Sequence, residues 1–376
     1  MPLKLDSKLL KIGLSSILEF CKKTTNLDSS VLTFISGKGK FSIYFNFSGS
    51  QALFETKIKN KDEWALSLLV SELSALSFSG NETTLELEQK ELLRLTSART
   101  RVRLKGVPPD KALLKTKEKL SLSIAGKSDF LAIDLKALTS ALKLIAFKHN
   151  VQGLTNVPSI SFVGEKKKLK ISTADHYRAS LVSLAKDLFS SKADTKLDIP
   201  LEEMKTSLRA LTQIGSSEVK LKMLANKSAI ISGMKEGTSF IFKKMTTQPD
   251  IQNVHTYITD LKKEKPDLSI VIQSEELEQS VTISGSGEKD ILLDIIYEKD
   301  NLTFKYKLGS ATVTSKIKVL ETLLKPVKED MIKTYQPLLK DIFSKLDKNS
   351  DCKLYCWKSQ ILFKNNNVEF LVPRVD

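Results

Sequence analysis

The last third of the chain shows two hydrophobic periodicities in succession. Residues 336–346 carry apolar side chains at helical spacing, and Pro337 suits the first turn of a helix. Beyond this segment the apolar residues recur at every second position, as they do in half-buried strands. The pattern predicts one helix followed by three short strands, at residues 352–357, 360–364 and 368–372.

The same order of elements occurs in the two preceding thirds, although the copies share little sequence. The middle third has a helical pattern at residues 201–214, and the first third has one at residues 65–77. Three strand-like runs follow each helix, and an earlier amphipathic segment precedes each cassette. The runs are 219–223, 229–233 and 239–243 in the middle third and 84–88, 92–96 and 101–105 in the first; the earlier segments are 7–23, 135–147 and 275–281.

This repetition predicts an α+β fold made of three similar domains. Gly126 and the stretch from Pro249 to Pro266 interrupt the pattern, which places the domains at residues 1–124, 125–253 and 254–376. Three similar domains in one chain can pack around an axis. A second copy of the chain can then complete a closed ring.

The net charge of the chain is consistent with binding to nucleic acid. The 376 residues include 59 Lys and Arg against 44 Asp and Glu, a net charge of +15. Such a balance favours a polyanionic partner, nucleic acid or an anionic membrane surface, with a solvated lysine-rich surface as the alternative. The sequence has neither a signal-peptide pattern nor an apolar run of membrane-spanning length, so we expect a cytoplasmic protein.

Catalytic constellations are not evident in the sequence. His149, His176 and His255 have no HExxH spacing, and the glycines match neither a Walker A loop nor a dinucleotide fingerprint. The three cysteines are too few for a disulfide framework. The acidic pairs Glu202-Glu203, Glu275-Glu276 and Glu329-Asp330 suit helix starts better than a two-metal nuclease site. We therefore expect no enzyme activity, no cofactor and no metal.

One segment of the middle third resembles a known signature. Residues 169–184 contain Asp175 and Arg178 between apolar flanks, as in the Ala-Thr-Asp-Gly-His-Arg-Leu-Ala run of the bacterial DNA polymerase III β subunit, the sliding clamp. His176-Tyr177 replaces the family's Gly-His pair, and Ala179 replaces its leucine. Residues 240–245 with Pro249-Asp250 resemble the family's Phe-x-x-Lys-Leu and Phe-Pro-Asp-Tyr run. The end, residues 370–376, resembles its Val-Met-Pro-Met-Arg tail, and such divergence suits a bacteriophage-encoded member.

The resemblance implies a ring whose helices line a central hole and whose antiparallel sheets form the outer rim. Basic residues on these helices are then expected to face the phosphates of double-stranded DNA without reading its sequence. The expected DNA-facing residues are Lys11, Lys22, Lys23, Lys143, Lys148, Lys205, Arg209, Lys340 and Lys345.

The resemblance also implies a pocket that accepts short linear motifs from a DNA polymerase and a clamp loader. Apolar walls with a few polar groups suit an inserted hydrophobic anchor. Placed residue by residue, the pocket comprises Val157, Ala174, His176, Tyr177, Arg178, Ala179, Pro249, Val254, Phe370, Val372, Pro373 and Arg374. Because three of these positions depart from the family, the accepted motif is expected to differ as well.

Ring closure as a homodimer is the third implication. Arg99, Arg101 and Val102 resemble a first-domain edge that meets acidic residues of the other subunit's third domain. The expected partner region, residues 311–322, offers Lys316, Lys318 and only Glu321, which does not match that acidic pattern. The alternative function is a basic nucleic-acid-binding accessory protein that forms no ring, and a nuclease is a third.

Overall fold

We describe the protein from a computed structural model. It describes residues 2–24, 29–60, 62–125, 130–147, 159–165, 168–175, 177–191, 196–224, 228–245, 254–281, 291–298, 300–325 and 331–375. The chain forms two compact units, one of Met1–Thr139 and Asp187–Gln248 and one of Ser140–Lys186 and Pro249–Asp376. Each unit is considered by itself, and the three-domain division stays a prediction.

The first unit is built on a nine-stranded antiparallel sheet. β4 pairs with β17, and Phe54 lies opposite Phe240, so strands from the first and middle thirds of the sequence share this sheet. In spatial order its strands are β13 (Phe189–Ser190), β9 (Leu131–Asp134), β15 (Glu218–Met223), β16 (Ser228–Lys235), β17 (Thr238–Met245), β4 (Ser50–Lys57), β3 (Lys40–Phe47), β2 (Val31–Gly37) and β5 (Trp64–Leu69).

A second sheet in this unit has four strands. Leu85, Leu93 and Leu95 are buried on it, as the period-2 pattern predicted. Its strands in spatial order are β1 (Leu3–Asp6), β6 (Glu82–Gln89), β7 (Leu92–Thr96) and β8 (Arg101–Lys105). The unit also contains the residues of β14 (Lys196–Pro200), and a 3₁₀ turn at Lys186–Leu188 leads into β13.

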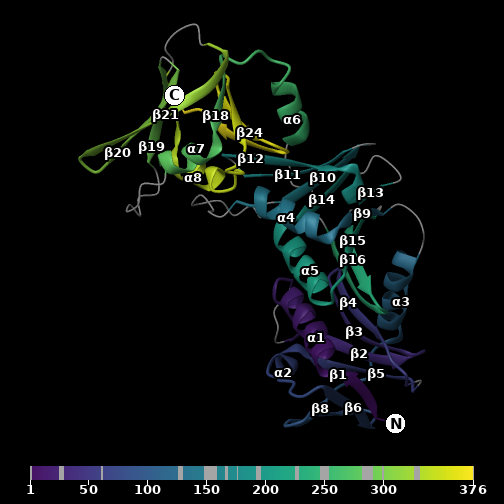
Figure 1. Cartoon of the computed structure of the whole chain (residues 1–376). Coiled ribbons are helices and arrows are strands. Elements are labelled where there is room, and N and C mark those ends of the chain that lie inside the picture. The colour runs from purple at the N-terminus through teal and green to yellow at the C-terminus, as the bar shows by residue number, and fades with distance from the viewer. Residues whose placement is uncertain are drawn as a thin grey trace. The chain divides into compact units, whose positions relative to one another are not determined.

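Two helices, α1 (Ser7–Lys22) and α5 (Leu201–Gln213), contact each other and cover one face of the nine-stranded sheet (Figure 1). The Asp6 carboxylate accepts a hydrogen bond from the Leu9 amide at 2.9 Å, which caps the start of α1. Phe20 of α1 packs on Phe242, with ring centroids 5.5 Å apart. These contacts fix which face of α1 is left for solvent.

A third helix, α3 (Lys111–Ala125), covers the opposite face of that sheet (Figure 1). Its Leu120 is buried against Tyr44, Leu53 and Ile241. Lys117 binds the buried carboxylate of Glu55 at 2.6 Å. The sequence analysis did not predict α3.

The sheet strands of the second unit are also antiparallel, and helices lie on both faces (Figure 1). α6 (Val254–Leu261) contacts β11 and β12 on one side, whereas α7 (Ser274–Val281) and α8 (Gln336–Phe343) contact each other. In spatial order the strands are β10 (Ser159–Glu165), β11 (Lys168–Ala174), β12 (Ala179–Ala185), β25 (Val368–Pro373), β24 (Gln360–Asn365), β23 (Asp351–Cys356), β18 (Leu268–Gln273), β21 (Ala311–Leu324), β20 (Asn301–Leu308), β19 (Leu292–Glu298) and β22 (Met331–Tyr335).

The helix-plus-three-strand cassettes of the middle and last thirds are confirmed, as are the helices predicted at 7–23, 135–147 (α4, Leu135–Ile145) and 275–281. The helix predicted at residues 65–77 is wrong. Its first residues form β5, which pairs with β2, and only Val70–Ser74 are helical (α2). Leu66 and Leu68 are buried two positions apart, and sheet pairing overrides a helical spacing that those leucines also fit.

Candidate DNA-facing helices and partner site

The face of α1 turned away from the sheet carries a stripe of cations. Leu10, Leu14 and Ile17 are buried, whereas the exposed positions fall at helical spacing on the other side. Those positions are Lys8, Lys11, Ser15 and Lys22. In the part of the chain that the structure describes, none of these three lysines has a carboxylate partner, so all three cations are open to an anion from solvent.

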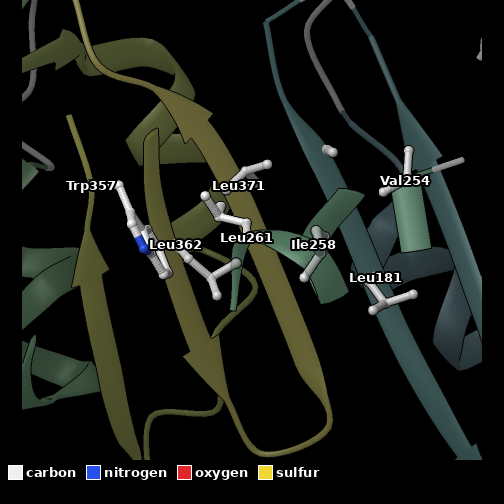
Figure 2. Close-up of a cluster of buried hydrophobic side chains, with 8 residues drawn as sticks. Leu181, Val254, Ile258, Leu261, Trp357, Leu362 and Leu371 are labelled. Atoms are coloured by element: carbon white, nitrogen blue, oxygen red, sulfur yellow. The ribbon is translucent and has the colours of Figure 1, made fainter. Parts of the chain in front are cut away.

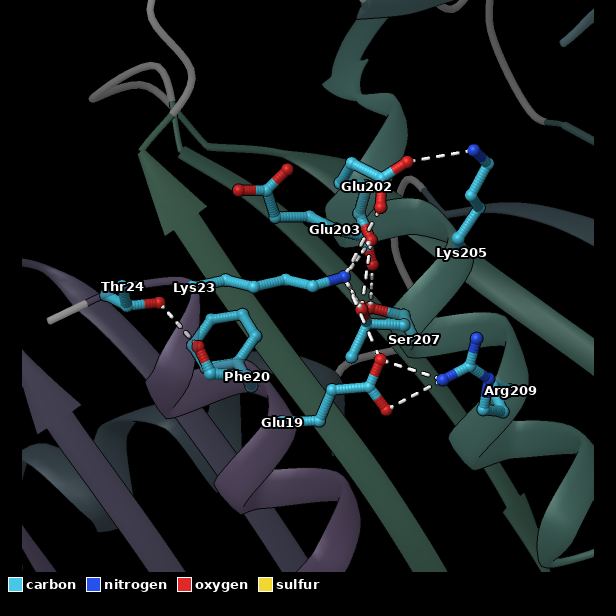
Figure 3. A network of polar contacts seen from close by, with 10 residues as sticks. Glu19, Phe20, Lys23, Thr24, Glu202, Glu203, Lys205, Ser207 and Arg209 are labelled. Carbon is cyan, nitrogen blue, oxygen red and sulfur yellow. Dashed lines mark hydrogen bonds and ion pairs between the residues drawn. The ribbon is translucent and has the colours of Figure 1, made fainter. Parts of the chain in front are cut away.

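The cations on α5 and at the end of α1 are arranged differently, because two glutamates lie among them (Figure 3). Arg209 Nη1 donates to both carboxylate oxygens of Glu19, at 2.8 and 3.0 Å. Lys205 Nζ lies 2.8 Å from Glu202 Oε1, and Lys23 Nζ lies 3.5 Å from Glu202 Oε2. The predicted DNA-facing residues Lys23, Lys205 and Arg209 are therefore already ion-paired.

Two more predicted DNA-facing residues are exposed on other helices. Lys143 lies on α4 and Lys340 on α8, and neither has a carboxylate partner among the described residues. Lys148 lies outside the described residues. A phosphate-binding role for Lys143 and Lys340 stays a prediction.

Lys345 does not fit the prediction. Its side chain is 4% exposed, lies 3.2 Å from the Asp341 carboxylate and donates to the Ala146 carbonyl at 2.7 Å. The Phe147 ring lies 5.0 Å from its Nζ. Because a DNA phosphate cannot reach this ammonium, we correct the prediction: Lys345 is a buried structural cation.

Three predicted pocket residues do come together, in an apolar cluster on the face of the sheet that α6 covers (Figure 2). Ala174, Ala179 and Val254 all pack in it. Val254, Ile258 and Leu261 follow one side of α6, and Trp357 Nε1 donates to the carbonyl of Glu264, three residues after that helix ends. The cluster residues that the sequence analysis missed are Leu181, Ile258, Leu261, Tyr355, Trp357, Leu362 and Leu371.

Phe370 and Val372 do not join this cluster, and their placement in the pocket is corrected. Phe370 lies opposite Phe363, whose ring packs on Phe343 of α8 with centroids 5.1 Å apart. Leu371 lies opposite Ala179 and therefore turns to the other face. Because side chains alternate along β25, Leu371 packs in the cluster, whereas the resemblance had assigned Phe370 and Val372 to the pocket.

Arg178 is buried as well, which removes it from the predicted pocket surface. Its Nε donates to Asp175 Oδ2 and its Nη1 to Asp341 Oδ2, both at 2.8 Å. Tyr177, the next residue, is 39% exposed, and its ring meets Tyr335 edge-on. Pro373 and Arg374 are partly buried. The Pro373 carbonyl accepts a hydrogen bond from Thr334 Oγ1, and the Arg374 amide donates one to the Ser359 carbonyl. Val157, His176 and Pro249 lie outside the described residues.

The predicted subunit edge is a free strand edge within its unit. β8 pairs with β7 alone among the described strands. Arg99 and Arg101 are exposed there, and Val102 is half-buried. In the other unit, residues 311–318 of β21 pair with β20, and Lys316 and Lys318 are exposed. Both edges therefore carry cations.

Comparison with solved structures gives a match over the whole chain. A DNA polymerase III β subunit from Eubacterium rectale has a TM-score of 0.74 at 14% identity, with 100% of each chain covered. A DNA polymerase sliding clamp from Pseudomonas aeruginosa has 0.72 at 12%, again with 100% of each chain covered. The β sliding clamp of Caulobacter crescentus has 0.72 at 12%, covering 100% of this chain and 99% of the other. The fold is that of a bacterial sliding clamp.

The sliding-clamp fold confirms the α+β fold class and the resemblance that the middle-third and C-terminal segments carried. No family model matches the sequence, and no curated protein matches it. None of the described helices is long and apolar enough to cross a membrane. Within the described residues, no cluster of His, Cys, Asp and Glu could hold a metal ion.

Proposed function

We propose that this chain is a DNA sliding clamp, a processivity factor that encircles duplex DNA and tethers a polymerase to it. The observation that supports the proposal is the likeness to solved clamps over the full length of the chain. The free lysine stripe on α1 supports contact with DNA, because such cations neutralise phosphates without reading bases. A clamp of this kind acts in the cytoplasm of a bacterial or phage-infected cell and is not an enzyme.

The polymerase and a clamp loader are proposed to dock at the edge of the cluster that α6 covers, beside the exposed Tyr177. Ala174 is partly buried at this edge, and Tyr177 stands two residues before the buried Ala179. A short linear motif with a hydrophobic anchor is the class of ligand that suits such walls. Arg178 contributes from beneath the surface, by holding the turn between β11 and β12 to α8.

Retention on DNA circles tests the proposal. An excess of the protein is incubated with nicked circular duplex DNA. Gel filtration then measures how much protein stays on the DNA before and after a single cut linearises the circle. A ring stays on the closed circle and slides off the linear form. Equal loss from both forms overturns the topological mechanism.

The accessory-protein alternative rests on one observation. The β8 edge and residues 311–318 both carry exposed cations, which oppose ring closure through these edges. An accessory protein of this kind binds short open oligonucleotides tightly and stays monomeric, whereas a clamp sediments as a dimer and binds open oligonucleotides feebly. Sedimentation across a concentration series, with a 42.0 kDa chain as the reference mass, separates the two.

A further inference from the structure

The cations of the α1–α5 surface fall into two groups that sequence alone treats as one. Lys8, Lys11 and Lys22 form an open stripe, whereas Lys23, Lys205 and Arg209 share the two carboxylates of Glu19 and Glu202 (Figure 3). Both groups lie on helices that rest on one sheet of the same unit. The two groups thus share one supporting sheet and differ in whether carboxylates lie beside the cations.

The paired cations remain within reach of solvent. The side chain of Arg209 is 63% exposed and that of Lys205 is 44% exposed. Lys23 is held more firmly, because it also donates to Thr206 Oγ1 at 2.7 Å. The hydrogen bond from Lys205, with the charges of Lys205 and Lys23, holds the pKa of Glu202 below its ordinary value. The Glu202 carboxylate is therefore ionised at neutral pH.

We propose that Glu19 and Glu202 act as internal counterions, which Lys23, Lys205 and Arg209 exchange for DNA phosphates as the duplex moves past. The proposal rests on the function proposed above and names the residues that keep its DNA contact weak. Each of these cations has an anion beside it both between phosphates and at a phosphate. Its energy therefore changes little along the DNA, and the surface resists trapping at any one position.

Counterion release gives the proposal a measurable form. A free lysine that binds a phosphate releases condensed cations from the DNA, and log K falls with log salt by about 0.9 per phosphate neutralised. A cation that must leave a carboxylate to bind a phosphate leaves that carboxylate to recruit a salt cation, which cancels the release. The open stripe on α1 should therefore account for most of the salt dependence.

The experiment measures binding of the full chain to a short linear duplex by fluorescence anisotropy across a salt series. Glu19→Gln keeps the size of the side chain and frees Arg209. Glu202→Gln does the same for Lys205, whereas Lys23 keeps its contact with Glu19 at 3.8 Å. We expect each variant to bind several-fold more tightly at low salt, with a slope steeper by about 1. Lys11→Gln should make the slope shallower by about 1, and Arg209→Gln should leave it unchanged.

Arg209→Gln combined with Glu19→Gln supplies the matched control, because Arg209 should contribute as a free cation in the Glu19→Gln variant and is absent from the combined one. We expect the combined variant to lose the gain that Glu19→Gln alone produces. Circular dichroism and thermal melting of each variant verify that the helices are intact. A loss from Arg209→Gln equal to that from Lys11→Gln, or unchanged slopes in both glutamine variants, overturns the internal-counterion proposal.

Failure of this proposal differs from failure of the clamp function. A wild-type protein that is retained on circles but shows unchanged slopes in the glutamine variants remains a clamp without internal counterions. A protein that circles do not retain loses the clamp assignment whatever the slopes are. The two assays therefore answer separate questions.

Discussion

Arg178 donates from Nη1 to Asp341 Oδ2 at 2.8 Å, joining two side chains that are 1% and 0% exposed and stand 163 residues apart in the sequence. A second donation, from Nε to Asp175, and the Phe147 ring 4.0 Å from the guanidinium complete the enclosure of Arg178. The motif that carried the family resemblance is therefore a structural joint. It fixes the turn between β11 and β12 to helix α8.

Removing the guanidinium should be costly. Arg178→Ala leaves the buried Asp341 carboxylate with one fewer cation, and breaking a buried ion pair typically costs about 3–5 kcal/mol. We expect the free energy of unfolding to fall by that amount in denaturant titrations followed by circular dichroism. Asp341→Ala and the double variant complete a cycle. Additive losses within about 0.5 kcal/mol would contradict direct coupling.

Lys345 and Lys340 provide a matched pair on one helix and the turn that follows it. Lys345→Met should lower stability by about 1.5–3 kcal/mol, because Asp341 and the Ala146 carbonyl lose a charged donor. Lys340→Met, at an exposed site, should change stability by less than about 0.5 kcal/mol. In DNA titrations we expect the larger effect from the other variant: Lys340→Met should reduce the salt slope, and Lys345→Met should leave it unchanged. A reduced slope with unchanged stability for Lys345→Met would restore Lys345 to the DNA-facing set.

Sequence periodicity could have placed Lys345 correctly. It lies seven residues after Leu338 and four after Asp341, so it falls on the buried side of the helical pattern. A hydropathy pattern treats every lysine as a surface residue. The burial of Asp341, which neutralises Lys345, becomes known only from the fold. The pairing of Arg209 with Glu19 escaped prediction for a related reason, since those residues stand 190 positions apart.

The repeat predicted most elements because helix and strand spacings alternate cleanly in the middle and last thirds. Residues 65–77 were mispredicted where the two spacings coincide. α6 was missed because the stretch from Pro249 to Pro266 suggested an interdomain junction, although Val254, Ile258 and Leu261 keep helical spacing. On β25 the prediction chose Phe370 and Val372, the two neighbours of Leu371. A shift of one residue along a strand moves the predicted side chains to the opposite face of the sheet.

Buried thiols should be unreactive in the native protein. Cys21, Cys352 and Cys356 are all buried, and desolvation raises the pKa of Cys352 to about 12. Since the thiolate is the reactive form, we expect a thiol reagent at neutral pH to label none of them in native protein. All three should react in denaturant. Rapid labelling of native protein at one site would reveal local opening there, located by peptide mapping.

The stability contributed by Glu202 should depend on pH with a defined sign. Its pKa is lowered in the folded state, so its contribution is complete above the ordinary value of 4.5 and disappears as pH falls through the lowered pKa. Glu202→Gln should therefore cost stability at neutral pH and nothing in strong acid. The cost should not exceed about 1 kcal/mol, because half of the side chain is in solvent. A pH-independent difference in thermal melting would contradict the ionic origin.

Gly13 sits where α1 comes closest to the sheet. A Cβ at this position would lie 2.6 Å from Cδ1 of Phe54, a fully buried ring that packs on Phe240 with centroids 5.1 Å apart. Gly13→Ala should gain about 1 kcal/mol of helix propensity and lose about 1–3 kcal/mol to overpacking. We expect a net loss in denaturant titrations, because Phe54 is fully buried and packs against Phe240.

Ser15→Ala, two residues later on the exposed side of α1, is the control for helix propensity without overpacking. It should leave stability unchanged or raise it slightly. A displaced α1 also carries Glu19 and Lys23 away from Arg209 and Glu202, so Gly13→Ala should raise the salt slope of DNA binding in the same direction as Glu19→Gln. A stabilised Gly13→Ala protein would mean that the sheet yields to α1 and that the close packing at Phe54 does not fix the position of the helix.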